Sequence, residues 1–284
     1  MTKLVQLKDG TQLSSLGQGT WMLGENPKAR TAEKQSIIIG IENGVTLIDT
    51  AEMYGSGASE SLIGEAIQGY DRSKLFLVSK VYPHNAGRNA IFQSCAASLQ
   101  RLGTDSLDLY LLHWRGSVPL SETVECMEEL VKQGLIKRWG VSNFDVDDMQ
   151  ELLSVKHGDR CMVNQVLYHL GSRGIEYSLY PWLKKQGIVT MAYCPVAQGG
   201  DLKEALLGDP VLSGIAASYG ISVIELLLCW VLSKEQIIAI PRTSNPDHAY
   251  QNAKALDINF RADDIEQMEA QFPSPTRKVY LDIV

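Results

Sequence analysis

Short runs of β-branched and leucine residues alternate with longer amphipathic stretches along most of the chain. The short runs have the length of buried strands, and the longer stretches carry apolar residues at the spacing of one helix face. This alternation is typical of repeated strand–helix units that build an α/β protein with a parallel sheet. The strand candidates are 15–17, 46–48, 75–78, 108–112, 137–141, 162–165, 189–192 and 237–240. Eight such units predict a (β/α)8 TIM barrel.

The predicted helices carry capping signals at their ends. The main candidates are 31–42, 87–101, 121–132, 146–153 and 177–185. Asp145 is suited to accept hydrogen bonds from the first N–H groups of the helix at 146. Gly103 and Gly134 follow two other helices, where a left-handed exit is favoured. These signals support compact strand–helix units.

Three further segments are expected to extend the barrel. Asp9-Gly10 between two short apolar runs predicts an N-terminal β-hairpin outside the main sheet. Residues 201–233 are too long for one connector and predict two helices before the eighth strand, while 262–271 predict a terminal helix. No Ser/Gly-rich or low-complexity stretch marks a boundary, so we expect one barrel domain over 1–284.

Composition narrows the class of protein. An apolar content of 45% with 21% charged residues suits a large buried core. The net charge of -7 and the absence of a basic run argue against a nucleic-acid partner. The longest apolar stretch, 221–232, is too short to cross a bilayer, and the first ten residues lack the apolar core of a signal peptide. We therefore expect a cytoplasmic protein without a membrane partner.

The five cysteines are widely spaced and include no C-x-x-C pair. This pattern predicts reduced thiols and no metal site.

Polar residues stand at the ends of three predicted strands, where the active site of such a barrel lies. Asp49 and Tyr54 follow the second strand, Lys80 follows the third, and His113 follows the fourth. Taken singly, each has a structural explanation: an Asp caps a loop, a Lys reaches solvent and a His satisfies core hydrogen bonds. Their combination at the ends of neighbouring strands instead favours a catalytic set.

This set suits carbonyl reduction, because hydride addition to a carbonyl leaves an oxygen that needs a proton and local stabilisation. A free Tyr phenol has a pKa of about 10. We expect the Lys80 ammonium to lower the pKa of Tyr54, the proton donor, and Asp49 to hold Lys80 charged and in place. A neutral His113 would donate a hydrogen bond to the carbonyl oxygen.

Several stretches resemble the aldo-keto reductase family. They are 47–55 (LIDTAEMYG), 78–80 (VSK), 107–114 (LDLYLLHW), 140–143 (GVSN), 164–165 (NQ), 192–195 (AYCP) and 240–243 (IPRT). The similarity covers nearly the whole chain and looks closest to bacterial methylglyoxal-reductase-type members. It implies that Asp49, Tyr54, Lys80 and His113 form the catalytic tetrad. It also implies that NADPH binds extended across the barrel rim, and indeed no G-x-G-x-x-G follows the first strand.

The resemblance also implies a set of cofactor contacts. Tyr193 would stack on the nicotinamide ring, whose carboxamide Ser142, Asn143 and Gln165 would bind. The structural alternative is that Ser142 and Asn143 cap the next helix and that Tyr193 fills the barrel mouth. The remaining positions are Gly19, Thr20, Trp21, Asp49, Pro195, Val196, Ile240, Pro241, Arg242, Thr243, Ser244, His248, Gln251 and Asn252.

The expected adenosine end departs from the family pattern. Arg242 stands where Lys is usual, His248 where Arg is usual, and Gln251 where Glu is usual, so that only Asn252 matches. Arg242 can bind a phosphate bidentately, whereas a His is largely uncharged at pH 7. NADPH is therefore the expected cofactor, and NADH stays open.

The substrate side is expected to have an aromatic wall around an open, shallow pocket. Trp21, Met53, Tyr82 and Trp114 would form this wall, with core packing as the alternative for each of them. The expected substrate contacts are Trp21, Tyr54, Tyr82, His113 and Trp114. Such a pocket favours small aldehydes and dicarbonyls such as methylglyoxal. Two alternatives stay open: a Schiff-base aldolase using Lys80, which an acidic partner disfavours, and a cofactor-sensing regulatory protein. Family habit predicts a monomer.

Overall fold

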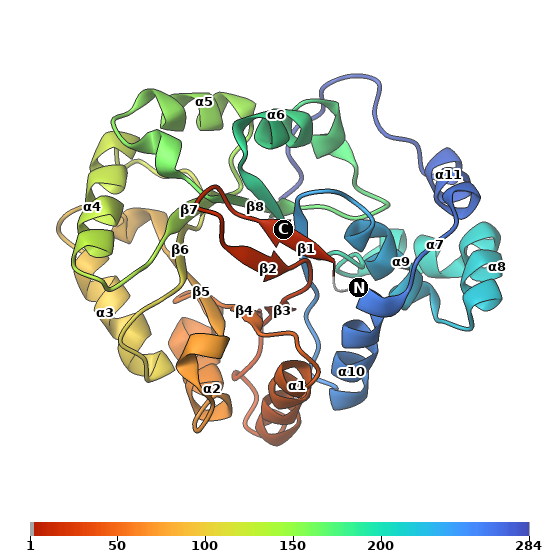
Figure 1. Cartoon of the computed structure of the whole chain (residues 1–284), viewed down its shortest axis with the longest axis horizontal. Coiled ribbons are helices and arrows are strands. Elements are labelled where there is room, and N and C mark those ends of the chain that lie inside the picture. Colours follow the sequence, from red (N-terminus) through yellow and green to blue (C-terminus); the bar gives the residue numbers. More distant parts are fainter. Residues whose placement is uncertain (1–2, 284) are drawn as a thin grey trace.

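Among residues 3–283, which the computed structural model describes, eight parallel strands lie in sequence order around one barrel (Figure 1). Met1, Thr2 and Val284 of the expected domain fall outside this range. The strands are β3 (Gln18–Gly19), β4 (Leu47–Asp49), β5 (Phe76–Val81), β6 (Leu109–Leu112), β7 (Trp139–Ser142), β8 (Val163–Leu167), β9 (Val189–Tyr193) and β10 (Ile237–Ile240). Bridges from Leu16 to Ala239 and from Gly19 to Arg242 join the first strand to the last. The (β/α)8 prediction is confirmed.

Helices form the outer ring of the barrel (Figure 1). Asp145 caps its helix through a capping box with Asp148, and Gly103 ends another helix at a φ of 64°. Both agree with the local signals in the sequence. The helices are α1 (Arg30–Glu42), α2 (Ala58–Ala66), α3 (Ile91–Leu102), α4 (Leu120–Lys132), α5 (Val146–Ser154), α6 (Leu179–Gln186), α7 (Gly200–Gly208), α8 (Pro210–Tyr219), α9 (Val223–Leu232), α10 (Pro246–Lys254) and α11 (Ala262–Gln271).

The N-terminal hairpin closes one end of the barrel. Strands β1 (Leu4–Gln6) and β2 (Gln12–Ser14) pair antiparallel and cross the front of the barrel in Figure 1. Val5 and Leu7 are buried against Leu47, Phe76 and other residues at the starts of the barrel strands. This packing removes apolar surface from water and covers the amino-terminal end of the barrel. Only the opposite end, at the carboxyl ends of the strands, stays open for a site.

Two expectations about the elements were wrong. Residues 201–233 hold three helices rather than two, because the Asp209 side chain accepts hydrogen bonds from the first N–H groups of α8 and Pro210 begins a new helix there. The first strand is assigned at 18–19, where it pairs with β4, rather than at 15–17. Residues 15–17 meet the last strand only through Ala239, and the Ser15 N–H donates to the Lys3 carbonyl instead.

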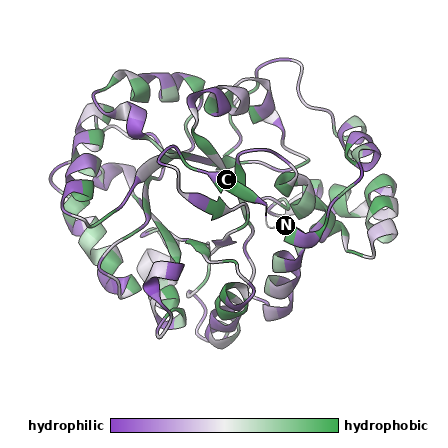
Figure 2. Ribbon diagram, viewed as in Figure 1, coloured by the Kyte–Doolittle hydropathy of each residue, from purple (hydrophilic) through white to green (hydrophobic). Residues whose placement is uncertain are grey.

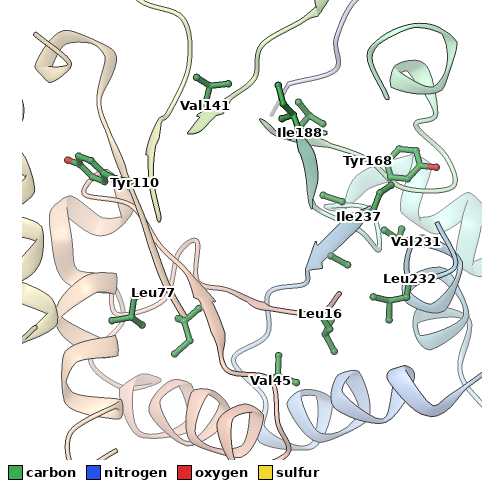
Figure 3. Packing of buried hydrophobic residues seen from close by; sticks show 14 of the residues in the cluster. Leu16, Val45, Leu77, Tyr110, Val141, Tyr168, Ile188, Val231, Leu232 and Ile237 are labelled. Atoms are coloured by element: carbon green, nitrogen blue, oxygen red, sulfur yellow. The ribbon is translucent and has the colours of Figure 1, made fainter. Parts of the chain in front are cut away.

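Most of the apolar core lies between the strands and the helix ring. Figure 2 shows largely hydrophobic strands inside helices of mixed polarity, and Figure 3 shows Leu16, Leu77, Tyr110 and Ile237 packed in this layer. Full burial of one such Leu contributes about 1.5–3 kcal/mol. This rigid layer fixes the strand ends that carry the site.

No single helix among residues 3–283 is long and apolar enough to span a bilayer. The bent pair α8 and α9 meets that requirement by length and composition alone.

Candidate active site

A pocket of about 480 Å³ opens at the carboxyl ends of the strands. Residues from β3, β4, β7, β8, β9 and β10 and from the loops after them converge on it, as the barrel architecture requires. Its lining consists of Gly19, Thr20, Trp21, Met22, Asp49, Met53, Tyr54, His113, Ser142, Asn143, Gln165, Tyr193, Cys194, Pro195, Val196, Ala197, Gln198, Lys203, Ile240 and Arg242.

Lys80 is hydrogen-bonded to three of the buried polar groups beneath the pocket. Its Nζ donates to Asp49 Oδ2 at 2.8 Å, to the Thr50 carbonyl at 2.7 Å and to the Tyr54 hydroxyl at 3.1 Å. These contacts use all three protons of an ammonium group. The Lys80 side chain is fully buried. The sequence predicted that Lys80 follows the third strand, but it lies within β5. The barrel wall itself therefore positions it.

The loop that presents Tyr54 depends on unusual backbone geometry. Tyr54 begins a 3-10 turn in which Gly55, Ser56 and Gly57 have positive φ values of 56°, 53° and 91°. A Cβ on Gly57 would lie 2.5 Å from the Arg101 side chain. Arg101 in turn donates to the buried carboxylate of Glu60 at 2.6 Å. The turn is therefore fixed by both its glycines and the ion pair beneath it.

A second set of hydrogen bonds holds the backbone of Asp49. The Thr20 hydroxyl donates to the Asp49 carbonyl at 2.8 Å and accepts from the Ser59 hydroxyl at 2.8 Å. Thr20 is fully buried. Thr20 lines the pocket, as expected for a cofactor contact, but its hydroxyl is hydrogen-bonded to the backbone at the end of β4.

Burial dominates the protonation of the central pair. It raises the pKa of the Asp49 carboxyl and lowers the pKa of the Lys80 ammonium, and the attraction between the two groups opposes both shifts. Each group thus stabilises the charged form of the other, as a buried ion pair requires.

Tyr54 corrects an expectation. The pKa of Tyr54 is not lowered by Lys80: burial, followed by the negative charge of Asp49, raises it well above the usual value of 10.0. A phenolate in this place would lose its hydration and face a carboxylate, which outweighs one hydrogen bond from an ammonium. Tyr54 therefore keeps its proton in the resting protein.

His113 is a neutral imidazole at the edge of the same pocket. Burial, reinforced by the charge of Lys80, lowers the pKa of His113 to about 2. Its Nδ1 has no hydrogen-bond partner among the described residues. Its ring lies edge-on to Tyr54 at 5.8 Å and against Trp114 at 4.9 Å. These contacts keep the imidazole beside the phenol.

The residues expected at the nicotinamide end line the far wall of the pocket. Asn143 has a φ of 59° and links the His113 carbonyl to the Tyr193 hydroxyl through its side-chain amide. Gln165 donates to Asp49 Oδ1 at 2.7 Å, and the Ser142 hydroxyl donates to the Gln165 carbonyl at 2.8 Å. The structure thus joins this wall directly to Asp49.

Only some of the residues expected at the adenosine end of the cofactor and at the substrate line the main pocket. Arg242 lines the pocket, and its Nε donates to the Trp21 carbonyl at 3.1 Å. Tyr82 and Trp114 do not line the pocket but meet edge-on at 5.9 Å behind His113. Of the others, Pro241, Thr243 and Asn252 line a separate narrow cavity near α10, whereas Ser244, His248 and Gln251 line neither cavity.

Four lining residues were not singled out from the sequence: Met22, Ala197, Gln198 and Lys203. Met22 directly follows a tryptophan that was expected at the site. Lys203 lies in α7, in the segment that was predicted only to form helices, and no local signal distinguishes it from a surface lysine. Cys194 is half-buried at the pocket wall, where burial raises the pKa of its thiol to about 11.

Comparison with known proteins gives consistent results. The Aldo/keto reductase family model matches residues 15–271. Methylglyoxal reductase YeaE of Escherichia coli is 49% identical over 282 residues, covering 99% of each chain. Two crystal structures of an aldo/keto reductase from Klebsiella pneumoniae, one with NADP and acetate and one with NADPH, superpose with a TM-score of 0.97. They share 47% identity with this chain, and all of both chains is covered.

Proposed function

Because the chain belongs to the aldo/keto reductase family, we propose that it uses NADPH to reduce small aldehydes and dicarbonyls such as methylglyoxal. Family membership makes the chain an NAD(P)H-dependent oxidoreductase. The observation that carries the finer proposal is the 3.1 Å hydrogen bond from Lys80 to Tyr54 in a pocket with room for a small substrate.

The pocket suits a nicotinamide cofactor in shape and chemistry. Tyr193 offers a flat aromatic surface, and Asn143 and Gln165 offer amide groups for a carboxamide. Arg242 offers a fixed positive charge for a phosphate. NADPH, when bound, would supply the hydride that reduces the carbonyl carbon. The NADPH and NADP complexes of the Klebsiella protein support this choice over NADH.

Tyr54 is proposed as the proton donor. As the carbonyl oxygen gains negative charge, it becomes a stronger base than the phenol and takes the proton from the Tyr54 hydroxyl. The Lys80 ammonium, already hydrogen-bonded to that oxygen, stabilises the phenolate that this transfer creates. The raised pKa of Tyr54 keeps the proton in place until that moment.

His113 and Asp49 complete the proposed set. The neutral imidazole of His113 would donate a hydrogen bond to the carbonyl oxygen and so orient it toward Tyr54. Asp49 balances the charge of Lys80 at 2.8 Å and keeps its ammonium beneath the phenol.

The substrate is proposed to be small because apolar side chains close the pocket around Tyr54. Trp21, Met53 and Val196 form much of this lining. Tyr82 and Trp114 would shape the approach on the His113 side. The similarity to a methylglyoxal reductase supports a dicarbonyl substrate.

Tyr54→Phe tests the proposal. We expect turnover of methylglyoxal to fall by about 10²–10⁴-fold, the usual contribution of a general acid, while quenching of tryptophan fluorescence by NADPH persists. Tyr177→Phe, at an exposed position, is the matched control. Equal initial rates for Tyr54→Phe and the parent would show that the proton comes from elsewhere.

A Schiff-base role for Lys80 requires a free amine. All three protons of the ammonium are engaged in hydrogen bonds, one of them to a carboxylate, so the nitrogen has no lone pair for attack. We expect borohydride to trap no carbonyl adduct on Lys80, as judged by the intact mass of the protein.

A further inference from the structure

The ring of His113 is held by packing rather than by a hydrogen bond at its buried nitrogen. Its Nδ1 has no hydrogen-bond partner in the part of the chain that the structure describes. A hydrogen bond at one ring nitrogen usually fixes the tautomer and orientation of an imidazole. Here the ring instead contacts Tyr54 at 5.8 Å and Trp114 at 4.9 Å. The position of Trp114 therefore bears directly on the orientation of His113.

Trp114 is supported in turn by the loop between β5 and α3. Trp114 is 37% exposed, so the protein interior holds only part of it. Its ring meets the ring of Tyr82 edge-on at 5.9 Å, and Tyr82 stacks on His84 at 4.8 Å. Edge-on and stacked contacts are the arrangements that aromatic rings prefer. A series of ring contacts thus connects the β5–α3 loop with His113.

Glu52 holds this loop in place from the neighbouring loop after β4. Its Oε1 accepts a hydrogen bond from the Tyr82 N–H at 2.7 Å and another from the side-chain amide of Asn85 at 3.2 Å. These two donors stand at the two ends of the 3-10 turn Pro83–Asn85. The Glu52 N–H donates to the Lys80 carbonyl at 3.4 Å. Glu52 therefore fixes the loop that carries Tyr82 against the loop that presents the proton donor.

We propose that Glu52 is a positioning residue for His113. It acts through the ring contacts of Tyr82 and Trp114 and does not itself line the pocket. This inference rests on the proposed function, in which His113 orients the carbonyl group of the substrate. In a dicarbonyl, two carbonyl groups compete for the same hydrogen bond. The direction in which the His113 ring points then decides which of them is held for reduction.

Substitutions at position 52 separate the hydrogen bonds of Glu52 from its charge. Glu52→Ala removes both contacts to the loop. Glu52→Gln removes the charge but keeps an acceptor oxygen at the same reach, whereas Glu52→Asp keeps the charge and is one methylene shorter. Glu65→Ala, at a surface glutamate of α2 that pairs with Arg30, is the matched control. Tyr82→Ala, alone and combined with Glu52→Ala, completes a double-mutant cycle.

The measurements are kcat and KM for methylglyoxal at saturating NADPH, together with the ratio of the two alcohols formed. Transfer of a hydride to the aldehyde carbon and a proton to its oxygen gives hydroxyacetone. The same transfer to the ketone gives lactaldehyde, and each reaction consumes one NADPH. A loss of stability lowers the amount of active enzyme but leaves this ratio unchanged. The ratio therefore reports carbonyl orientation, and circular dichroism reports folding.

For Glu52→Ala we expect kcat to fall roughly ten-fold, a part of the 10²–10³-fold that loss of one hydrogen-bond donor to a developing oxyanion costs. KM should stay within about two-fold of the parent, because the affected interaction strengthens in the transition state. The product ratio should move toward the minor alcohol of the parent. Glu52→Asp should behave like Glu52→Ala, and it decides the test if the alanine variant does not fold.

Glu52→Gln and Glu65→Ala should give the product ratio of the parent. The double variant should match Tyr82→Ala, since Glu52 acts only through that loop. A parent-like product ratio in both Glu52→Ala and Glu52→Asp would overturn the proposal, whatever their kcat. A Glu52→Gln variant as impaired as Glu52→Ala would assign the effect to charge and overturn it as well, as would additive effects in the double variant. A parent that reduced no carbonyl would instead refute the proposed function, and this inference with it.

Discussion

Asn in place of Asp49 would leave the fully buried ammonium of Lys80 without its carboxylate. The two groups are 2.8 Å apart, and their side chains are 0% and 3% exposed. Removing one partner of such a pair costs about 3–5 kcal/mol, because the other charge stays out of water without compensation. At about 2–4 °C per kcal/mol, the midpoint of thermal unfolding of Asp49→Asn should fall by roughly 10 °C.

The pH dependence of this loss has a defined sign. Burial lowers the pKa of Lys80 below its usual 10.5, and loss of Asp49 removes the main opposing effect. Between that lowered pKa and 10.5 the unfolded chain binds a proton that the folded chain does not, so the stability of the variant rises with pH. The deficit of Asp49→Asn relative to the parent should therefore shrink as the pH rises from 7 toward 10.

The assay is thermal unfolding followed by circular dichroism. Asp147→Asn, whose side chain is 89% exposed, is the matched control and should melt with the parent. In Asp49→Asn with Lys80→Met no buried charge is left, and most of the lost stability should return. The reasoning would be refuted by an Asp49→Asn variant that melts within about 2 °C of the parent, or by a double variant no more stable than Asp49→Asn.

Three further predictions concern other parts of the site and its scaffold. Because the pKa of His113 is about 2, His113→Asn should lower activity without changing the shape of the pH–rate profile between pH 5 and 8, and a limb present only in the parent would contradict this. Gly57→Ala, with a φ of 91° and Arg101 in the way, should destabilise by about 1–3 kcal/mol in thermal melts, and Gly44→Ala, with a φ of 84° and open space, by less. Asp145→Ala should cost about 1 kcal/mol through loss of the capping box, as measured by urea unfolding, whereas Asp147→Ala should cost little.

Local signals explain what could be predicted from the sequence. The strand–helix alternation indicated the barrel, and single residues such as Asp145 and Gly103 marked helix ends through contacts with their immediate neighbours. The third helix within 201–233 was missed because its start depends on how Asp209 and Pro210 divide an otherwise continuous apolar pattern. Lys203 was missed because no local pattern in α7 indicates that this residue borders the pocket.

The direction of the Tyr54 shift depends on three-dimensional burial, which sequence spacing does not contain. Lys80 does contact the phenol, as the sequence suggested, but the loss of water on burial, followed by the carboxylate of Asp49, decides the direction of the pKa shift of Tyr54. A phenol with a lowered pKa would partly ionise before the substrate arrives and would then have no proton to give. Here the ammonium is paired in advance and the phenol stays protonated. In the proposed mechanism, the contribution of Lys80 is therefore greatest when charge develops on the Tyr54 oxygen during proton transfer, which is when stabilisation increases the rate.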